Sequence, residues 1–176
     1  MTTIEFTTMD SPIGELLLIS NGHALTGVHT DADVDRLGDS VERRDDGVLR
    51  AAAAQLEAYF AGNRTGFDVP IEPRGTPFQL RVWRALRDIP YGATVGYGEL
   101  AGRVGNARAA RAVGLANARN PIAVIVPCHR VVGADGSLTG YAGGLERKRR
   151  LLDLEEPRPP EAWRGRAGRT RAGHDM

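Results

Sequence analysis

The sequence of 176 residues contains one cysteine, one lysine and no internal repeats. One cysteine cannot close an internal disulfide bond, which excludes a disulfide-stapled secreted scaffold. No apolar run approaches the roughly 18–20 residues of a membrane span, and the first residues lack the basic segment and apolar core of a signal peptide. We therefore expect a cytoplasmic protein without membrane-spanning segments.

Acidic and basic residues are distributed unequally, although the net charge is only +1. Residues 1–73 hold 13 acids and 5 bases, a balance of −8, whereas residues 74–156 hold 13 bases and 7 acids, a balance of +6. Residues 157–176 hold 5 bases and 2 acids and are poor in apolar residues. We predict an acidic first domain, a basic second domain that faces a polyanion, and a disordered basic tail, with these boundaries.

The acidic part has the pattern of a small α/β domain. Apolar residues alternate or cluster over residues 3–9, 13–19 and 24–30, which predicts a three-stranded antiparallel sheet. Residues 31–46 are polar and acidic, as in a surface loop or a frayed helix. Residues 48–61 have apolar side chains at helical spacing, which predicts one amphipathic helix.

The basic part has the pattern of a mainly helical domain. Thr76 followed by Pro77 is a typical helix start. Periodicity predicts helices over residues 77–89, 98–104, 108–119 and 145–155. The middle two are joined by a tight Gly-Asn turn and have the outline of a helix-turn-helix. The apolar run 123–126 is β-like and leads directly to the cysteine.

Cys128 is followed at once by His129 and Arg130. A lone cysteine is usually a small buried hydrophobe, but this one lies between an apolar run and a glycine-rich loop, which predicts a constrained turn near solvent. A thiol is mostly protonated at neutral pH, and a neighbouring imidazole can accept its proton. A carboxylate on the other imidazole nitrogen would orient the ring. Four carboxylates stay open for that role: Glu146, Asp153, Glu155 and Glu156.

A metal site is not expected. The histidines are scattered and, with one cysteine, give no zinc-ligand spacing: His23, His29, His129 and His174. We interpret His23 and His29 as surface or packing residues.

Several motifs, in the same order, resemble those of the O6-alkylguanine-DNA alkyltransferases. They are IPYG at 89–92, YGELA at 97–101, ARAVGLANARNP at 110–121, VIVPCHRVV at 124–132 and LTGYAGGLERKRRLLDLE at 138–155. The match is close over the second half and loose over the first, where it implies a ribonuclease-H-like domain. The resemblance implies direct repair of O6-alkylguanine, and less well O4-alkylthymine, by irreversible single transfer of the alkyl group to cysteine. It implies no cofactor and a monomer on the minor groove of double-stranded DNA, with cooperative binding left open.

The same resemblance implies roles for single residues. Cys128 is the alkyl acceptor, His129 a base that acts through water, and Glu155 the carboxylate partner of the histidine. Asn120 is the hinge asparagine that holds the cysteine turn, and the Tyr97 hydroxyl serves the leaving guanine.

Further residues are implied to contact DNA or the extruded base. Arg111 fills the space that the flipped base leaves. The small side chains beside it let the helix approach the groove closely, and the DNA-contacting set is Arg111, Ala110, Ala112, Gly114 and Arg130. The pocket for the base is lined by Tyr97, Val131, Tyr141 and Ala142. Alanine at 142 lacks the hydroxyl that some relatives have there.

Three other functions compete with this interpretation. A non-catalytic lesion sensor resembles this family but replaces the cysteine, which is present here. A cysteine hydrolase usually takes its histidine from far along the chain and leaves the helix pair unexplained. A helix-turn-helix regulator leaves Cys128, His129 and Tyr97 without roles.

Overall fold

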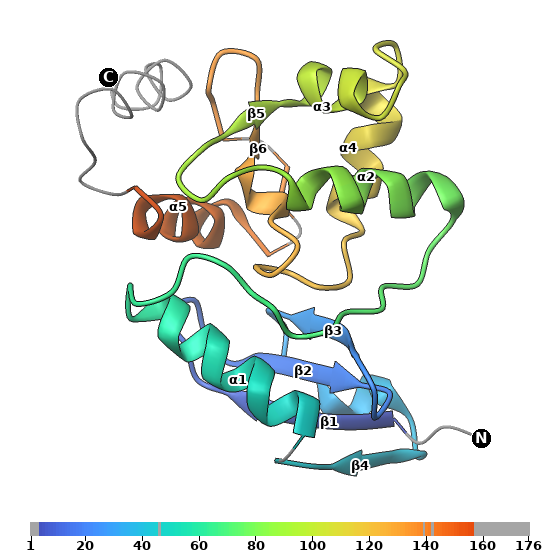
Figure 1. Cartoon of the computed structure of the whole chain (residues 1–176), viewed down its shortest axis with the longest axis vertical. Helices are drawn as coiled ribbons and strands as arrows, with labels where there is room; N and C mark the ends of the chain where they lie inside the picture. The colour runs from blue at the N-terminus through green and yellow to red at the C-terminus, as the bar shows by residue number, and fades with distance from the viewer. Residues whose placement is uncertain (1–3, 46, 139, 142, 157–176) are drawn as a thin grey trace. The chain divides into compact units, whose positions relative to one another are not determined.

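The computed structural model describes residues 4–45, 47–138, 140–141 and 143–156 (Figure 1). These residues form two compact units, the first from residues up to 74 together with 121–125, the second from 75–120 and from 126 onward. The sequence assigns 121–125 to the second part, but the chain returns to the first unit there, just before the cysteine. The predicted tail, 157–176, lies outside the described residues.

The first unit is built on a four-stranded sheet in the order β3-β2-β1-β4. β1 (Ile4–Met9), β2 (Leu16–Ser20) and β3 (Leu25–His29) pair antiparallel, as predicted. β4 (Val41–Arg43) is an addition and pairs parallel to β1, with Ile4 opposite Val41. The loop or frayed helix predicted over 31–46 therefore contains β4 and the short 3₁₀ helix η1 (Val34–Leu37). Three residues on an exposed edge are too few to show a two-residue period.

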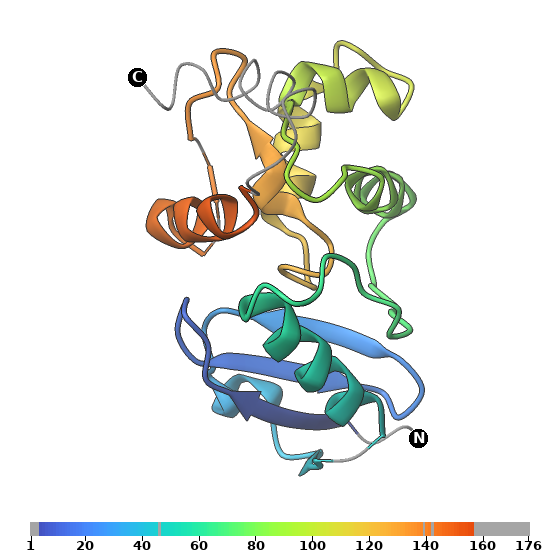
Figure 2. The same ribbon diagram turned by 60° about the vertical axis from the view of Figure 1, so that its left-hand side comes forward.

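Helix α1 (Gly47–Phe60) lies across one face of this sheet (Figure 2). Its buried side chains are Leu49, Ala52, Leu56 and Tyr59. They recur at three- and four-residue spacing, so they share one face of the helix. The sheet contributes further leucines to the same core, among them Leu16, Leu18 and Leu25, each fully buried.

The second unit is mainly helical, with α2 (Pro77–Arg87), α3 (Tyr97–Arg103), α4 (Ala110–Ala118) and α5 (Leu145–Leu154). The Thr76 hydroxyl accepts a hydrogen bond from the Gln79 amide at 3.1 Å, and the Gln79 side chain accepts one from the Thr76 amide at 3.0 Å. This reciprocal pair fixes the start of α2. The buried Trp83 indole donates to the Ala116 carbonyl at 2.8 Å and ties α2 to α4.

Three further short elements lie at or beside the cysteine. β5 (Val95–Gly96) and β6 (Val131–Val132) form a short parallel ladder, which the sequence did not predict. The 3₁₀ helix η2 (Cys128–Arg130) precedes β6 directly. No helix among the described residues is both long and apolar enough to cross a bilayer.

The approach to the cysteine is a series of turns and no strand, so the β-like prediction for 123–126 was wrong. Val124 has a φ of 70°, a left-handed conformation that is unusual for a β-branched residue. The Ile125 amide donates to the Ala123 carbonyl at 2.8 Å, which closes a tight turn. Ile122, Val124 and Val126 are all buried. Their apolar character reflects burial in turns and was mistaken for strand patterning.

Candidate active site around Cys128

Cys128 begins η2, and the residue is only 6% exposed, which corrects the predicted position near solvent. Side-chain amides hold the backbone on both sides of Pro127. The Asn120 amide donates to the Val126 carbonyl at 2.7 Å, and the Asn117 amide donates to the Cys128 carbonyl at 3.3 Å. Asn120, which the resemblance implies as the hinge asparagine, thus contacts the backbone just before Pro127, and Asn117 is a contact that the sequence did not reveal.

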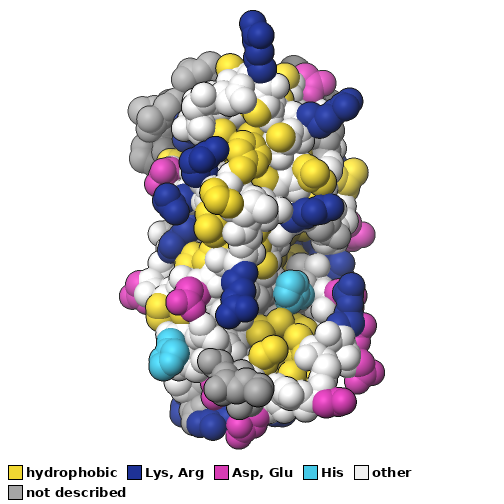
Figure 3. Space-filling view, turned by 90° about the vertical axis from the view of Figure 1, so that its right-hand side faces the viewer, with side chains coloured by type: hydrophobic (Ala, Val, Ile, Leu, Met, Phe, Trp, Pro, Cys, Tyr) yellow, Lys and Arg dark blue, Asp and Glu magenta, His cyan; other side chains and the backbone are white. Residues whose placement is uncertain are grey.

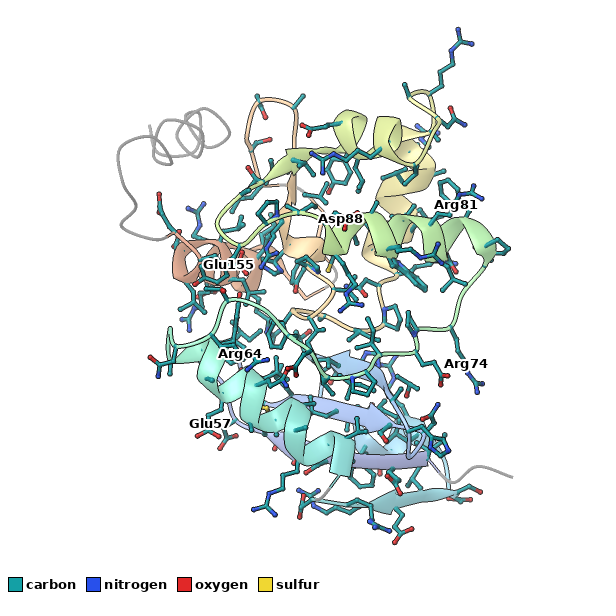
Figure 4. The ribbon with its side chains drawn as sticks, in the orientation of Figure 1. Glu57, Arg64, Arg74, Arg81, Asp88 and Glu155 are labelled. Atoms are coloured by element: carbon teal, nitrogen blue, oxygen red, sulfur yellow. The ribbon has the colours of Figure 1, made fainter. Side chains whose placement is uncertain are left out.

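The imidazole of His129 is fully buried and paired with one carboxylate. Its Nε2 lies 2.7 Å from Oε2 of Glu155, whose side chain is 1% exposed and which directly follows α5. Figure 4 labels Glu155 beside α5. Of the four carboxylates left open by the sequence, Glu155 is the one at the imidazole; the other three are exposed: Glu146, Asp153 and Glu156.

Glu155 is held ionised against its burial. Burial raises the pKa of this carboxyl, but the charge and hydrogen bond of His129, followed by those of Arg130, hold it well below its usual range. A carboxylate at the carboxyl end of a helix is also disfavoured by the helix dipole. The negative charge of Glu155 therefore depends on its two cationic or hydrogen-bonding partners.

The second imidazole nitrogen, Nδ1 of His129, is buried and has no hydrogen-bond partner among the described residues. When Nε2 carries the proton that Glu155 accepts, Nδ1 is the nitrogen with a free lone pair. A buried polar atom of this kind is typically satisfied by an ordered water. The ring is thus oriented to accept a proton on the side away from Glu155.

Burial raises the pKa of the Cys128 thiol, and three neighbours oppose this effect. They are a hydrogen bond from Asn120, the charge of Lys148 and the nearby hydroxyl of Tyr141. Lys148 is fully buried in α5, and its Nζ donates to the Val131 carbonyl at 2.5 Å. Burial lowers the pKa of Lys148 to about 8. The sequence did not single out Lys148, although it is the chain's only lysine and shares a helix face with Leu151 and Leu152.

Two tyrosines predicted at the base pocket lie close to the cysteine and its following loop. The Tyr141 hydroxyl is buried and forms no hydrogen bond of regular geometry among the described residues; burial and then the nearby thiol raise its pKa well above its usual value. The Tyr97 hydroxyl donates to the Gly140 carbonyl at 3.5 Å, a weak contact. Val131 is fully buried in β6, and Ala142 lies outside the described residues.

Arg130, which the resemblance grouped with the DNA contacts, lies in the interior. Its side chain is 7% exposed, and the guanidinium donates to both oxygens of Glu155 and to the Ile89 carbonyl. A side chain bound in this way presents almost no surface to DNA, and the prediction is corrected accordingly. Three successive residues, Cys128 to Arg130, are thus all buried.

Helices α3 and α4 form the predicted helix pair. Arg111 and Ala112 are exposed on α4, while Ala110 and Gly114 are half-buried. A Cβ added to Gly114 would lie 3.7 Å from the Tyr97 ring, an ordinary contact, so packing alone does not require glycine there. On the face that Figure 3 shows, basic side chains are spread among apolar ones over the second unit. Among the described residues no cluster of His, Cys, Asp and Glu could hold a metal ion.

Comparisons with known proteins place this geometry in a family. Residues 4–73 match the model of the 6-O-methylguanine DNA methyltransferase ribonuclease-like domain, and residues 77–157 match the model of its DNA binding domain. The chain is 54% identical over 157 residues to the methylated-DNA–protein-cysteine methyltransferase of Mycobacterium bovis, which covers 89% of this chain and 95% of that protein. The chain belongs to the 6-O-methylguanine DNA methyltransferase family.

Solved structures of 6-O-methylguanine DNA methyltransferases agree with this assignment. The crystal structure of Mycobacterium tuberculosis O6-methylguanine methyltransferase matches with a TM-score of 0.80 and 51% identity, covering 90% of this chain and 96% of that one. A crystal structure of Mycobacterium tuberculosis OGT in complex with DNA matches with a TM-score of 0.79 and 52% identity, covering 89% and 96%. The predicted family and the predicted order, a ribonuclease-like domain followed by a helical DNA-binding domain, are confirmed.

Proposed function

We propose that this protein repairs DNA directly, by moving the alkyl group of O6-alkylguanine to Sγ of Cys128 in one irreversible step. The observation that carries the proposal is the buried Cys128, followed by a histidine whose Nε2 lies 2.7 Å from Glu155. This arrangement has the parts of an activated nucleophile: a thiol, a base and a carboxylate that orients the base. The family membership supplies the substrate class.

The transfer begins with the proton of the thiol. His129 accepts it at Nδ1 through a water, and Glu155 and Lys148 stabilise the resulting imidazolium and thiolate, respectively. The thiolate attacks the alkyl carbon, the S–C bond forms, and the bond from that carbon to O6 breaks with its electron pair on guanine. The Tyr97 hydroxyl donates a hydrogen bond to the guanine as negative charge develops there, and the guanine takes up the proton that left the thiol by way of His129 and solvent, so both side chains return to their starting state. The thioether product has no leaving group that would regenerate the thiol, so each molecule reacts once.

We further propose that α4 enters the minor groove of double-stranded DNA and that a monomer suffices. The target base is stacked in the duplex and has to be flipped out to reach a buried thiol. Arg111 then occupies the space that the base leaves, and the small side chains around it permit close approach. Because the reactive thiol has to stay reduced, we place this activity in the cytoplasm.

The test is intact-mass measurement after incubation with duplex DNA that carries one O6-methylguanine. We expect a gain of about 14 Da, one CH2, on every active molecule and on the peptide that contains Cys128. The unmodified duplex is the matched control and gives no gain. No gain with the modified duplex, or a gain on another residue, would contradict the proposal.

A further inference from the structure

The guanidinium of Arg130 binds the carboxylate of Glu155 through two hydrogen bonds. Its Nε donates to Oε1 at 2.8 Å and its Nη2 donates to Oε2 at 3.0 Å. Oε2 is also the oxygen that lies 2.7 Å from Nε2 of His129. One carboxylate therefore serves the base and the arginine together, and the two parallel bonds from the arginine fix the plane in which it lies.

Arg130 is itself held by the IPYG turn, residues 89–92, which the sequence marks as a motif and the transfer reaction leaves without a role. Its Nη1 donates to the Ile89 carbonyl at 2.6 Å, and its Cζ lies 5.8 Å from the centre of the Tyr91 ring. The Tyr91 hydroxyl donates to the Leu154 carbonyl at 3.2 Å, one residue before Glu155. The turn thus contacts both the arginine and the backbone that carries the carboxylate.

We infer that Arg130, braced by the IPYG turn, is a positioning residue for alkyl transfer: it holds Glu155 in the orientation that serves His129. This inference rests on the proposed function. Arg130 itself touches neither the thiol nor the substrate in this role and acts through Glu155.

The balance of buried charge explains why such a residue is needed. In the resting site Arg130 and Glu155 cancel one another, so His129 can stay neutral and keep a lone pair for the proton of Cys128. After the proton has moved, the positive charge of the imidazolium is balanced by the negative charge of the thiolate. Without Arg130, the buried carboxylate would be balanced only by a protonated His129, which has no lone pair left to act as the base.

The experiment measures single-turnover transfer from the free base O6-methylguanine as a function of pH. For Arg130→Met we expect a loss of roughly 10- to 100-fold, typical of removing a group that orients a functional side chain. Because the charge of Glu155 is then balanced by a protonated ring in place of the guanidinium, the base is lost already at higher pH, and the acid limb of the rate profile moves to higher pH. Adding Glu155→Gln to Arg130→Met should cause no further loss beyond Glu155→Gln alone, because both act through one carboxylate. Arg87→Met, at an exposed arginine of α2, is the control and should react at the wild-type rate.

Other outcomes would overturn the inference. They are a wild-type rate and profile for Arg130→Met, losses that multiply in the double variant, or a loss confined to duplex DNA, which would return Arg130 to the DNA contacts. Should Arg130→Met fail to fold by circular dichroism, Arg130→Lys decides, since it keeps the charge and loses the paired hydrogen bonds. It should show a smaller loss with the same non-additivity, and a wild-type rate would count against the inference.

A second readout separates this inference from the proposed function. NMR of labelled imidazole nitrogens reports the protonation of His129, whether or not the protein transfers alkyl groups. We expect the Nδ1 and Nε2 signals at neutral pH to move toward those of a protonated ring in Arg130→Met. Unchanged signals would contradict the role of Arg130 even in a protein that transfers, and a wild-type protein without transfer would contradict only the proposed function.

Discussion

The two units of this protein differ most in what they bury. Among the described residues of the first unit, the buried polar side chains are the uncharged Thr7 and Ser20. The second unit buries Thr94 and Asn117, and also four titratable or charged side chains: His129, Arg130, Lys148 and Glu155. Burying an ionised group costs several kcal/mol unless it is paired and hydrogen-bonded. The second unit carries four such groups near one thiol, which is typical of a reactive site, whereas the apolar core of the first unit contributes to stability.

The two parts of the chain also differ in the sign of their net charge. The acidic balance of residues 1–73 and the basic balance of residues 74–156 separate a part that repels DNA phosphates from a part that attracts them. Nucleophile and net positive charge thus belong to one unit. The comparison predicts that substitutions of the thiol or of the buried charged and titratable groups of the second unit change alkyl transfer, while those in the core of the first unit change stability alone.

The largest effect is expected for Cys128→Ser. A serine hydroxyl is nearly isosteric but hardly ionises near neutral pH, so transfer should be abolished. Because the side chain is buried, affinity for duplex DNA should stay within about twofold of wild type. Intact mass reports transfer, and fluorescence anisotropy with a labelled duplex reports binding. Retained transfer would mean that Cys128 is not the acceptor.

Glu155→Gln should come next, with transfer slowed by roughly 100-fold or more because His129 loses its orienting charge. Since the folded protein lowers the pKa of Glu155, the carboxylate stabilises the fold above its ordinary pKa of 4.5, and this contribution is lost as pH falls. The variant should therefore be less stable than wild type in urea at pH 7, with a smaller difference at pH 3. Glu156→Gln, at an exposed neighbour, is the control; equal losses for the two variants would argue against a specific role.

Lys148→Met should raise the pKa of the Cys128 thiol and so lower the fraction of thiolate at neutral pH. The charge of Lys148 lowers the pKa of the thiol, so the variant should react about 10-fold more slowly with iodoacetamide at pH 7. The difference should shrink above pH 8, where wild-type Lys148 itself loses its proton. Cys128 is the only thiol, so the assay reports on this site alone. Arg150→Met, on the exposed side of α5, should react like wild type, and a constant difference at all pH values would exclude a charge effect.

Helix periodicity explains which residues of this site could be predicted from the sequence. Lys148, Leu151, Leu152 and Glu155 recur at the spacing of one helix face, and the two leucines mark that face as buried. That pattern favours Glu155 over the other three carboxylates as the partner of His129, and it predicts that Lys148 is buried on the same face. The burial of the Arg130 side chain could not be predicted in this way, because a 3₁₀ helix of three residues is too short to show a periodic buried face.

In the fold, too, long periodic segments could be predicted from the sequence and short ones could not. Strands β1 to β3 and helix α1 each show their hydrophobic period over five or more residues. β4 and the β5–β6 ladder contain two or three residues each, held by backbone hydrogen bonds that leave no period. The turns at 123–126 mislead in the other direction, since β-branched residues buried in turns look like a strand.

A smaller and more selective effect is expected for Arg111→Ala. If Arg111 replaces the stacking of the flipped base, its loss should slow transfer from duplex DNA roughly 10-fold or more and leave transfer from the free base unchanged. Arg108→Ala, at an exposed arginine just before α4, should instead weaken binding and flatten the log–log salt dependence by about 0.9 if it contacts one phosphate. Equal fractional losses on duplex and free base for Arg111→Ala would place this residue in the support of the fold or the thiol.

The smallest effect on transfer is expected for Leu56→Ala in α1. Leu56 is fully buried in the core of the first unit, so the truncation should lower the free energy of unfolding by about 2–5 kcal/mol. The rate of transfer from the free base, measured well below the unfolding midpoint, should match wild type, because every group assigned to the reaction lies in the second unit. Glu57→Ala, at the exposed neighbour labelled in Figure 4, should change neither quantity appreciably. A slower reaction in fully folded Leu56→Ala would show that the first unit shapes the site around Cys128, and the segment 121–125, which returns to the first unit just before the cysteine turn, would be the route by which it does so.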